Sequence, residues 1–238
     1  MKKLINTYLE KIGYQINRYP GADFRRRLHF LKQYKINKIF DVGANSGQFA
    51  MSIRKFGFDG EIISFEPQTS AFKQLSINAK NDKKWIQNNY ALGNENVVST
   101  INISSNSFSS SINEILDSHK DASPNSIYVS NEKIKIKRLD DIFEKYFKDD
   151  DRITLKVDTQ GYEKNVIDGA KNSLQKIIIL QLEMAIVPLY KDEMLLPDII
   201  KYLNEKNFEL IAIENGFSHP KTQHLLQADG IFLNKDLL

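Results

Sequence analysis

One stretch, residues 38–50 (KIFDVGANSGQFA), constrains the fold of this chain more than any other. An apolar run ends at Asp41 and Val42, a turn built from Gly43, Asn45 and Gly47 follows, and an apolar-periodic segment begins. This order predicts a strand, a tight turn and a helix start, the first half of a βαβ unit. Gly and Asn tolerate sharp, left-handed turns that can approach a ligand. The turn predicts a nucleotide or nucleoside cradle; the alternative is an ordinary βα turn in which these residues serve geometry alone.

A second strand-like run ends at Glu66, where Pro67 stops it. Glu66 lies 23 residues after Gly43, close to the offset at which nucleotide-binding α/β folds place an acid that accepts hydrogen bonds from ribose. The spacing is not G-x-G-x-x-G, because Asn45 replaces the second glycine and Gly47 comes one residue early, so NAD-linked and flavin oxidoreductases are disfavoured. A D-x-G-x-N-x-G turn followed by F-E-P resembles the S-adenosylmethionine site of class I methyltransferases.

Composition excludes several other classes. With 238 residues, of which 41% are hydrophobic and 26% charged, the chain can bury a sizeable globular core. No apolar run approaches the roughly 18–20 residues of a membrane span, and Asn6, Thr7 and Glu10 interrupt any signal-peptide core, so we expect a cytoplasmic protein. The absence of Cys excludes disulfides, thiolate metal sites and a Cys nucleophile.

The start of the chain is basic: its first 40 residues hold ten Lys or Arg against two acids, a net +8 that leaves −5 for the rest of a +3 chain. We expect residues 1–36 to form a helical extension, with helices at 2–17 and 23–34, and residues 37–238 to form the main domain. The apolar stripe of the first helix is expected to pack on the core rather than on a membrane. The charge suggests that residues 1–40 contact an anionic membrane or a phosphorylated carrier, with no nucleic acid favoured; the alternative is a solvated helical face.

Strands and helices alternate along most of the chain, which argues for a parallel sheet with helices on both faces. The main strands are expected at 37–42, 61–66, 85–92, 153–158, 176–183, 208–214 and 230–233, and helices at 47–57, 69–80, 163–170 and 192–206. Additional strands are expected at 97–103 and 133–137, and a further helix begins at residue 139. The serine-rich segment 104–111 is either a mobile flap over the cofactor pocket or a long loop.

Four acids, Asp41, Glu66, Asp158 and Glu183, each end a predicted strand. Ligands of open α/β sheets bind beyond the carboxyl ends of the strands, so these acids should gather at one edge. Asp41 would fix the glycine turn or contact the charged end of the cofactor, and Glu66 would accept from ribose. Asp158 is the first candidate for a general base or an anchor of the acceptor hydroxyl, and Glu183 is the second. Glu163 is interpreted as a first-turn helix acid.

Two further possibilities concern the same edge. Asp158, Glu183 and Asp229 could supply the oxygen ligands that Mg²⁺ prefers, although no ligand-dense motif marks such a site and a divalent metal is not favoured. His219 and His224 precede the last strand and could face the acceptor, whereas loop histidines are usually solvated.

Beyond the turn, several segments resemble the FkbM family of methyltransferases, in order and at ordinary spacings over residues 37–233. They are FDVGANSGQ (40–48), FEP (65–67), ALG (91–93), the serines near 109–111, RLDD (138–141), LKVDTQGYE (155–163) with GA (169–170), QLE (181–183), VPLY (187–190) and DGIF (229–232). The resemblance implies an α/β, Rossmann-like class I methyltransferase sheet of seven strands, with helices on both faces and the last strand antiparallel at the edge, in a domain covering residues 37–238.

The resemblance also implies a cofactor, S-adenosylmethionine, and its contacts. The implied contacts are Asp41, Gly43, Ala44, Asn45, Gly47, Glu66 and Pro67, with Ala91 and Leu92 lining the adenine pocket and Asp158 bordering the methyl group. The leading hypothesis is an O-methyltransferase that acts on a sugar hydroxyl in polysaccharide, glycolipid or natural-product biosynthesis. One alternative is a lipid or nucleic-acid acceptor, suggested by the basic first 40 residues. Another is a non-catalytic nucleoside-binding protein, against which the four strand-end acids argue.

Overall fold

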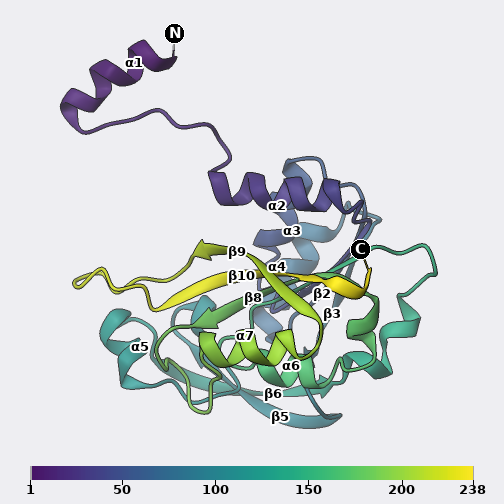
Figure 1. Cartoon of the computed structure of the whole chain (residues 1–238). Helices are drawn as coiled ribbons and strands as arrows, with labels where there is room; N and C mark the ends of the chain where they lie inside the picture. Colours follow the sequence, from purple (N-terminus) through teal and green to yellow (C-terminus); the bar gives the residue numbers. More distant parts are fainter. Residues whose placement is uncertain (1, 238) are drawn as a thin grey trace.

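A central sheet of seven strands organises the molecule, a computed structural model that describes residues 2–237 (Figure 1). In spatial order its strands are β3 (Trp85–Asn88), β2 (Glu61–Phe65), β1 (Lys38–Val42), β7 (Ile153–Val157), β8 (Ile177–Ala185), β10 (Gln227–Asn234) and β9 (Phe208–Asn215). The first five strands are mutually parallel, and β10 is antiparallel to both of its neighbours. The predicted α/β sheet with an antiparallel last strand is confirmed. Its expected position is wrong, because β10 lies between β8 and β9, and β9 forms the edge.

Both faces of this sheet are covered, which is why β1 and β7 are buried at every position. One face packs against α2 (Ala22–Gln33), α3 (Gln48–Lys55) and α4 (Thr69–Ala79) through a cluster that includes Ile39, Ile62 and Ile231. The opposite face packs against α6 (Glu163–Asp168), α7 (Leu196–Asn204) and a second sheet through a cluster that includes Phe40 and Leu155. Figure 1 shows α2 and α3 on one side and α6, β5 and β6 on the other.

The second sheet has three strands in the order β4 (Ala91–Leu92), β6 (Tyr128–Lys137) and β5 (Val97–Ser104). The single strand predicted at 85–92 is therefore wrong, since it divides into β3 in the main sheet and β4 in the second. Asn89 marks the division: its side chain donates to the backbone carbonyls of Glu66 and Pro67, each at 3.0 Å, and turns the chain from one sheet to the other.

Two helices differ from their predicted bounds. Instead of a helix from residue 139, the chain forms the short 3-10 turns η3 (Leu139–Asp141) and η4 (Phe143–Lys145), because the carboxylate of Asp140 accepts hydrogen bonds from Asn172 and Ser173. The helix predicted at 192–206 begins only at Leu196, where Pro lies in its first turn. The remaining short helices are η2 (Ser107–Ser109), α5 (Asp117–Ala122), η5 (Ser173–Lys176) and η6 (Lys235–Leu237).

The two predicted N-terminal helices behave differently. The first is α1 (Lys2–Leu9) followed by η1 (Glu10–Ile12), and it projects away from the sheets (Figure 1). Its apolar stripe does not pack on the core as expected, because α2 occupies that face of the sheet through Leu31 and its neighbours. The domain boundary after residue 36 stays a prediction. No helix within residues 2–237 has the length and apolar character needed to cross a membrane.

Candidate functional site

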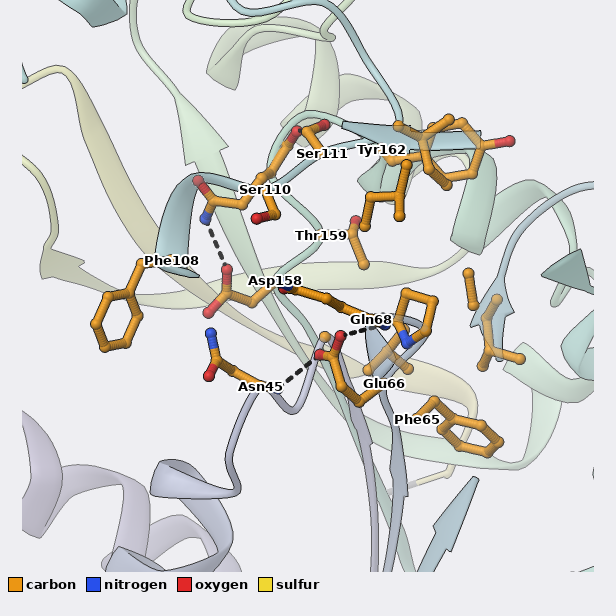
Figure 2. Close-up of a pocket in the computed structure, with 18 of the residues that line it drawn as sticks. Asn45, Phe65, Glu66, Gln68, Phe108, Ser110, Ser111, Asp158, Thr159 and Tyr162 are labelled. Carbon is orange, nitrogen blue, oxygen red and sulfur yellow. Dashed lines mark hydrogen bonds between the residues drawn. The ribbon is translucent and has the colours of Figure 1, made fainter. Parts of the chain in front are cut away.

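A cavity of about 240 Å³ opens at the carboxyl ends of β1, β2 and β7 (Figure 2). The turn after β1, the end of β2, the start of the second sheet and the serine-rich segment contribute its walls. The predicted residues that line it are Gly43, Asn45, Glu66, Pro67, Ala91, Leu92, Asp158 and Glu183. The sheet thus brings together residues that lie more than 100 positions apart in the sequence.

Glu66 stabilises the glycine turn through hydrogen bonds. Its carboxylate accepts the backbone N–H groups of Asn45 and Gln68, both at 2.8 Å, and Figure 2 shows it at the centre of the cavity floor. Burial raises the pKa of Glu66 to about 7, although the two N–H donors oppose that rise. Its charge therefore changes near neutral pH.

The glycines of the turn are required for two different reasons. Gly43 has a φ of +75°, and a Cβ there would lie 1.8 Å from the backbone oxygen of Asp158 on the neighbouring strand. Gly47 has a φ of +87°, and its Cβ would lie 2.6 Å from the ring of Trp85, below the turn. Gly43 thus permits two strand ends to meet at the cavity, whereas Gly47 permits packing of the helix start on the core.

Most apolar side chains lie at one end of the cavity and most polar side chains at the other, where Figure 2 also shows Phe108. Phe65, Ala91 and Leu92 line the apolar end with Ile101 of β5. Asn45 and Asp158 lie at the polar end, where Figure 2 shows their side chains facing one another. A ligand with a flat apolar group and a polar, charged end matches this division.

A buried lysine connects two of the predicted acids. The ammonium group of Lys156 lies 3.3 Å from a carboxylate oxygen of Asp41 and 3.3 Å from one of Asp158. Burial lowers the pKa of Lys156, but the two carboxylates outweigh it and the pKa is raised. Asp41 is fully buried beneath the cavity, and burial raises its pKa against the attraction of Lys156. In this structure Asp41 holds Lys156, and Lys156 in turn holds Asp158 at the cavity wall.

Carboxylates continue across the sheet in one row. Asp158 directly follows β7, whereas Glu183 does not end its strand as predicted, because β8 continues to Ala185 through pairing with β10. Glu183 pairs with Asp229, and Asp229 pairs with Glu214. Arg27 of α2 contacts the far end of this row, at 2.8 Å from Asp229 and 2.5 Å from Glu214. Paired residues of a sheet share a face, so the four carboxyl groups lie along one edge.

Glu183 occupies the middle of this row, and its surroundings favour its neutral form. Burial, together with the charges of Asp158, Glu163 and Asp229, raises the pKa of Glu183 well above its usual range. Glu183 is therefore suited to donate a hydrogen bond, whereas Asp158 has Lys156 as a counter-ion and a side chain that is 39% exposed.

Gln160 joins the two cavity carboxyl groups. Its side-chain amide donates to Asp158 at 2.9 Å and to Glu183 at 2.8 Å, while the hydroxyl of the buried Tyr190 donates to its oxygen at 2.8 Å. The backbone φ of Gln160 is +57°, a left-handed conformation that is unusual for a residue other than Gly, Asn or Asp. Such a conformation persists only where surrounding contacts maintain it. The hydrogen bonds of its side chain to Asp158, Glu183 and Tyr190 are such contacts.

The serine-rich segment forms the outer wall. Phe108, Ser110 and Ser111 line the cavity, and the Ser111 hydroxyl donates to the backbone oxygen of Gln160 at 2.6 Å. Behind them the hydroxyl of Ser109 lies 3.0 Å from that of Ser126. Ser111 thus joins the segment to the turn after β7, and Ser109 joins it to the loop before β6; whether the segment moves as a flap stays a prediction.

Glu163 organises the turn after β7. Its carboxylate accepts the backbone N–H groups of Thr159, at 2.8 Å, and Gly161, at 3.2 Å, and burial raises its pKa to about 7 against these donors. It is the first residue of α6, as predicted for a first-turn acid, but its contacts are to the loop that carries Gln160.

Three predicted cofactor residues lie outside the cavity wall. Asp41 lies beneath it, Ala44 is buried in the core cluster on the α2 side, and Gly47 immediately precedes α3 as its N-cap residue. His219 contacts Asp121 of α5 at 3.1 Å, so its ring serves the loop before β10. Their roles as ligand contacts stay predictions.

The magnesium alternative finds no support in the geometry. Asp229 is engaged by Arg27, and Glu183 favours its protonated form. Within residues 2–237, no three or more His, Asp or Glu side chains are arranged to hold a metal ion.

The cavity wall also includes residues that the sequence patterns did not predict, among them Gln160, Ile101 and Thr159. For Gln160 a signal existed, because it follows the strand-end acid and precedes a glycine, the pattern of a tight turn beside the site. Ile101 carried no local signal, since only the packing of the second sheet on the first brings it to the cavity.

Several solved structures of methyltransferases resemble the fold of this chain. Methyltransferase FkbM from Methylobacillus flagellatus KT superposes with a TM-score of 0.51 and 13% identity, over 82% of this chain and 43% of that one. Fibrillarin from Aeropyrum pernix, solved with S-adenosyl-L-methionine, gives 0.48 and 10% over 83% and 66%, and TrmK from M. capricolum, solved with S-adenosyl-homocysteine, gives 0.46 and 9% over 87% and 68%.

The chain spans less than half the length of the first of these proteins, and at such identities the likeness shows the fold alone. None of the curated protein sequences compared with the chain matches it. The model of the methyltransferase FkbM domain, however, matches residues 41–210, which is more than half of the chain. The turn after β1, the Asp158 segment and the cavity between them all fall within that match, and the chain therefore belongs to the FkbM family of methyltransferases.

Proposed function

We propose that the protein is an S-adenosylmethionine-dependent O-methyltransferase that methylates a sugar hydroxyl in polysaccharide, glycolipid or natural-product biosynthesis. One observation carries the proposal: Glu66 and Asp158 face the same cavity from opposite sides of the glycine turn, within the matched family domain. Glu66 is placed to hold the ribose of a nucleoside, and Asp158 to hold the hydroxyl that receives the methyl group.

The residues present fit this cofactor. Glu66 would accept hydrogen bonds from the ribose hydroxyls, and Phe65, Ala91 and Leu92 would contact the adenine at the apolar end. Asn45 and the backbone after Gly43 would face the amino-acid end. When bound, S-adenosylmethionine supplies a methyl group on a sulfonium, which needs little further activation.

The protein's own contribution is to align the acceptor and take its proton. Alignment of reacting atoms can supply much of the acceleration of such a transfer. Asp158, held by Lys156 and Gln160, orients the acceptor hydroxyl and accepts its proton. Glu183, whose raised pKa keeps it protonated, donates a hydrogen bond to a neighbouring oxygen of the acceptor.

A carbohydrate acceptor agrees with the polar end of the cavity. Carboxyl and amide groups from Asp158, Glu183, Gln160 and Asn45 lie together there, and such groups bind polyhydroxylated molecules through several hydrogen bonds. A lipid or nucleic-acid acceptor and a non-catalytic nucleoside-binding role stay alternatives. A cytoplasmic location, and contact of residues 1–40 with an anionic surface or phosphorylated carrier, are part of the same proposal.

The acceptor class is tested by transfer of a radiolabelled methyl group from S-adenosylmethionine to monosaccharides, nucleotide sugars, lipids and RNA. We expect label in a base-stable ether of a sugar, because an ether resists conditions that cleave a methyl ester. Label found only in lipid or RNA would replace the carbohydrate assignment, and tight cofactor binding without transfer to any class would favour the non-catalytic alternative.

The cofactor assignment predicts a pH-dependent affinity for S-adenosylhomocysteine. The ionised form of Glu66 is the better acceptor for ribose hydroxyls, and its pKa is about 7, so affinity should fall as the pH drops through neutrality. Between roughly pH 8 and pH 6 we expect about a tenfold loss, since the ionised fraction changes by about that factor. Glu66→Gln should remove this pH dependence, and Glu66→Ala should weaken binding about 100-fold or more. Isothermal titration calorimetry measures each value.

Glu61→Gln, at the opposite end of β2, is the matched control and should retain the wild-type pH profile. Thermal unfolding of each variant separates lost ligand contacts from a loosened turn, because Glu66 also holds Asn45 and Gln68. Wild-type protein that is well folded and binds no S-adenosylhomocysteine would contradict the cofactor assignment.

A further inference from the structure

The N-terminal segment forms hydrogen bonds within itself before the chain reaches α2 and the two sheets, which we call the body of the protein. The side-chain amide of Asn6 donates to the backbone oxygen of Ile16 at 3.1 Å, and the backbone N–H of Ile16 donates to the Asn6 side chain at 2.8 Å. Gly13, with a φ of +81°, ends the helical turns, and the N–H of Tyr14 donates to the oxygen of Leu9 at 2.9 Å. Residues 2–16 are thus a small folded unit, which we call the N-terminal unit.

The apolar side chains of this unit face solvent. The exposed fractions are 69% for Leu4, 41% for Ile5, 71% for Tyr8, 67% for Ile12, 69% for Tyr14 and 46% for Ile16. At about 100° per residue, positions 4, 5 and 8 of α1 fall within an arc of about 100°, and Ile12 follows at the end of η1. They form one continuous stripe, which is the pattern of a helix that lies on an apolar surface.

The charge of the unit is positive. Residues 2–16 contain Lys2, Lys3 and Lys11 against Glu10, a net +2, and Arg18 follows the unit. The ammonium group of Lys11 lies 5.6 Å from the centre of the Tyr8 ring, so a cation flanks the apolar stripe. A basic amphipathic helix of this kind fits a surface that is apolar below and anionic above.

The arginines of α2 have a different role. Arg25 donates to the backbone oxygens of Arg18 and Pro20, while Arg26 and Arg27 pair with the buried Glu214. Arg26 and Arg27 are thus paired with carboxylates of the protein, whereas no salt bridge is seen for the lysine of the N-terminal unit whose side chain the structure describes, Lys11.

The unit is joined to the body at a defined point. The ring of Tyr19 packs at 5.4 Å from that of Phe56, and the ammonium group of Lys55 lies 5.2 Å from the Tyr19 ring centre. Figure 1 shows α1 displaced from the sheets, with an extended link to α2. The attachment leaves the apolar stripe clear of the cavity, which opens at the strand ends.

We propose that the N-terminal unit docks the protein on an anionic lipid bilayer. Leu4, Ile5 and Ile12 enter the headgroup boundary, the tyrosines lie at the interface with their hydroxyls toward water, and Lys11 faces lipid phosphates. This inference rests on the part of the proposed function that gives residues 1–40 an anionic partner, and it names that partner; it does not depend on the cofactor or on the methyl acceptor. Bare phosphate or RNA would engage the charge but would leave the apolar stripe exposed.

The experiment is sedimentation of the full chain with vesicles, either of phosphatidylcholine alone or with about one third phosphatidylglycerol. We expect binding to the anionic vesicles at least tenfold tighter than to the neutral ones, and weakened by salt. The variant Leu4→Gln, Ile5→Gln, Ile12→Gln should lose about tenfold or more of that binding, because lipid affinity scales with buried apolar area. Gln is a good helix former, so the helix is retained.

The matched control is Ile77→Gln, Ile86→Gln, Val98→Gln, three apolar residues exposed on the body at 56%, 40% and 63%. It should bind vesicles like the wild type. A second variant, Lys2→Gln, Lys3→Gln, Lys11→Gln, should lose the preference for anionic vesicles while the stripe remains.

Equal vesicle binding by the wild type and the stripe variant would overturn the proposal. So would a wild type that dimerises in solution, ignores vesicles and becomes monomeric in the stripe variant, since a second copy would then cover the stripe. S-adenosylhomocysteine titration of each variant keeps the two proposals separate: a stripe variant that binds this ligand normally but not vesicles supports docking, whatever the acceptor proves to be.

Discussion

Replacing Gly43 with alanine will abolish measurable binding of S-adenosylhomocysteine and destabilise the protein by several kcal/mol. The added Cβ would lie 1.8 Å from the backbone oxygen of Asp158, so β1 and β7 could not keep their present separation at the cavity. Relief of this overlap must move the turn, Asp158 or both, and overpacking of a buried site typically costs about 1–3 kcal/mol, with a left-handed residue adding about 1–2. Calorimetric titration and thermal unfolding give the two results.

Gly57→Ala is the matched control for this substitution. Gly57 has a φ of +95°, yet a Cβ there meets no atom of residues 2–237 within 4 Å. It should therefore show only the left-handed penalty, about 1–2 kcal/mol, and bind the ligand normally. If the two variants proved equally mild, the close approach of the turn to Asp158 would be wrong, and with it the reason for the first glycine.

Asp158→Asn will lower methyl transfer by about 100-fold or more, the usual contribution of a positioned general base. The amide keeps the size of the side chain and can still contact Gln160 and Lys156, but it cannot accept a proton from the acceptor hydroxyl. The affinity for S-adenosylhomocysteine should change by less than about threefold, because the variant leaves the ribose and adenine contacts in place. The measurements are labelled methyl transfer to the best acceptor and calorimetric titration.

Glu214→Gln removes a carboxylate from the far end of the same row and is the matched control. Glu214 pairs with Arg26 and Arg27 and is remote from the cavity, so the substitution should affect stability more than turnover. Undiminished turnover by Asp158→Asn would remove the proposed base. A comparable loss in Glu214→Gln would mean that the net charge of the row matters rather than the position of Asp158.

Local sequence patterns determined much of the site. The alternation of strands and helices predicted the parallel sheet, and parallel strands bring their carboxyl ends to one edge. Gly43, Asn45 and Glu66 were therefore found from spacing alone, because the backbone geometry of a βα turn admits few residues. Asp158 followed from the same rule because it comes directly after the buried strand β7, and Glu183 was found at the same edge although β8 continues two residues beyond it.

Tertiary contacts decided what no local pattern encodes. The stripe of α1 and the apolar face of α2 have similar periodicity, but only α2 reaches the sheet, so the first was wrongly assigned to the core. The division of residues 85–92 between two sheets, and the arrival of Ile101 at the cavity, depend on pairing with β6, over 30 residues away.

The neutral tendency of Glu183 is likewise a property of the assembled row and its burial, not of any one strand. The spacing of apolar residues along the sequence indicates which side chains can share one face of a helix or strand. Distant segments compete for the same apolar surface, and this competition determines which element covers each face. In this protein the N-terminal stripe is left unburied as a result.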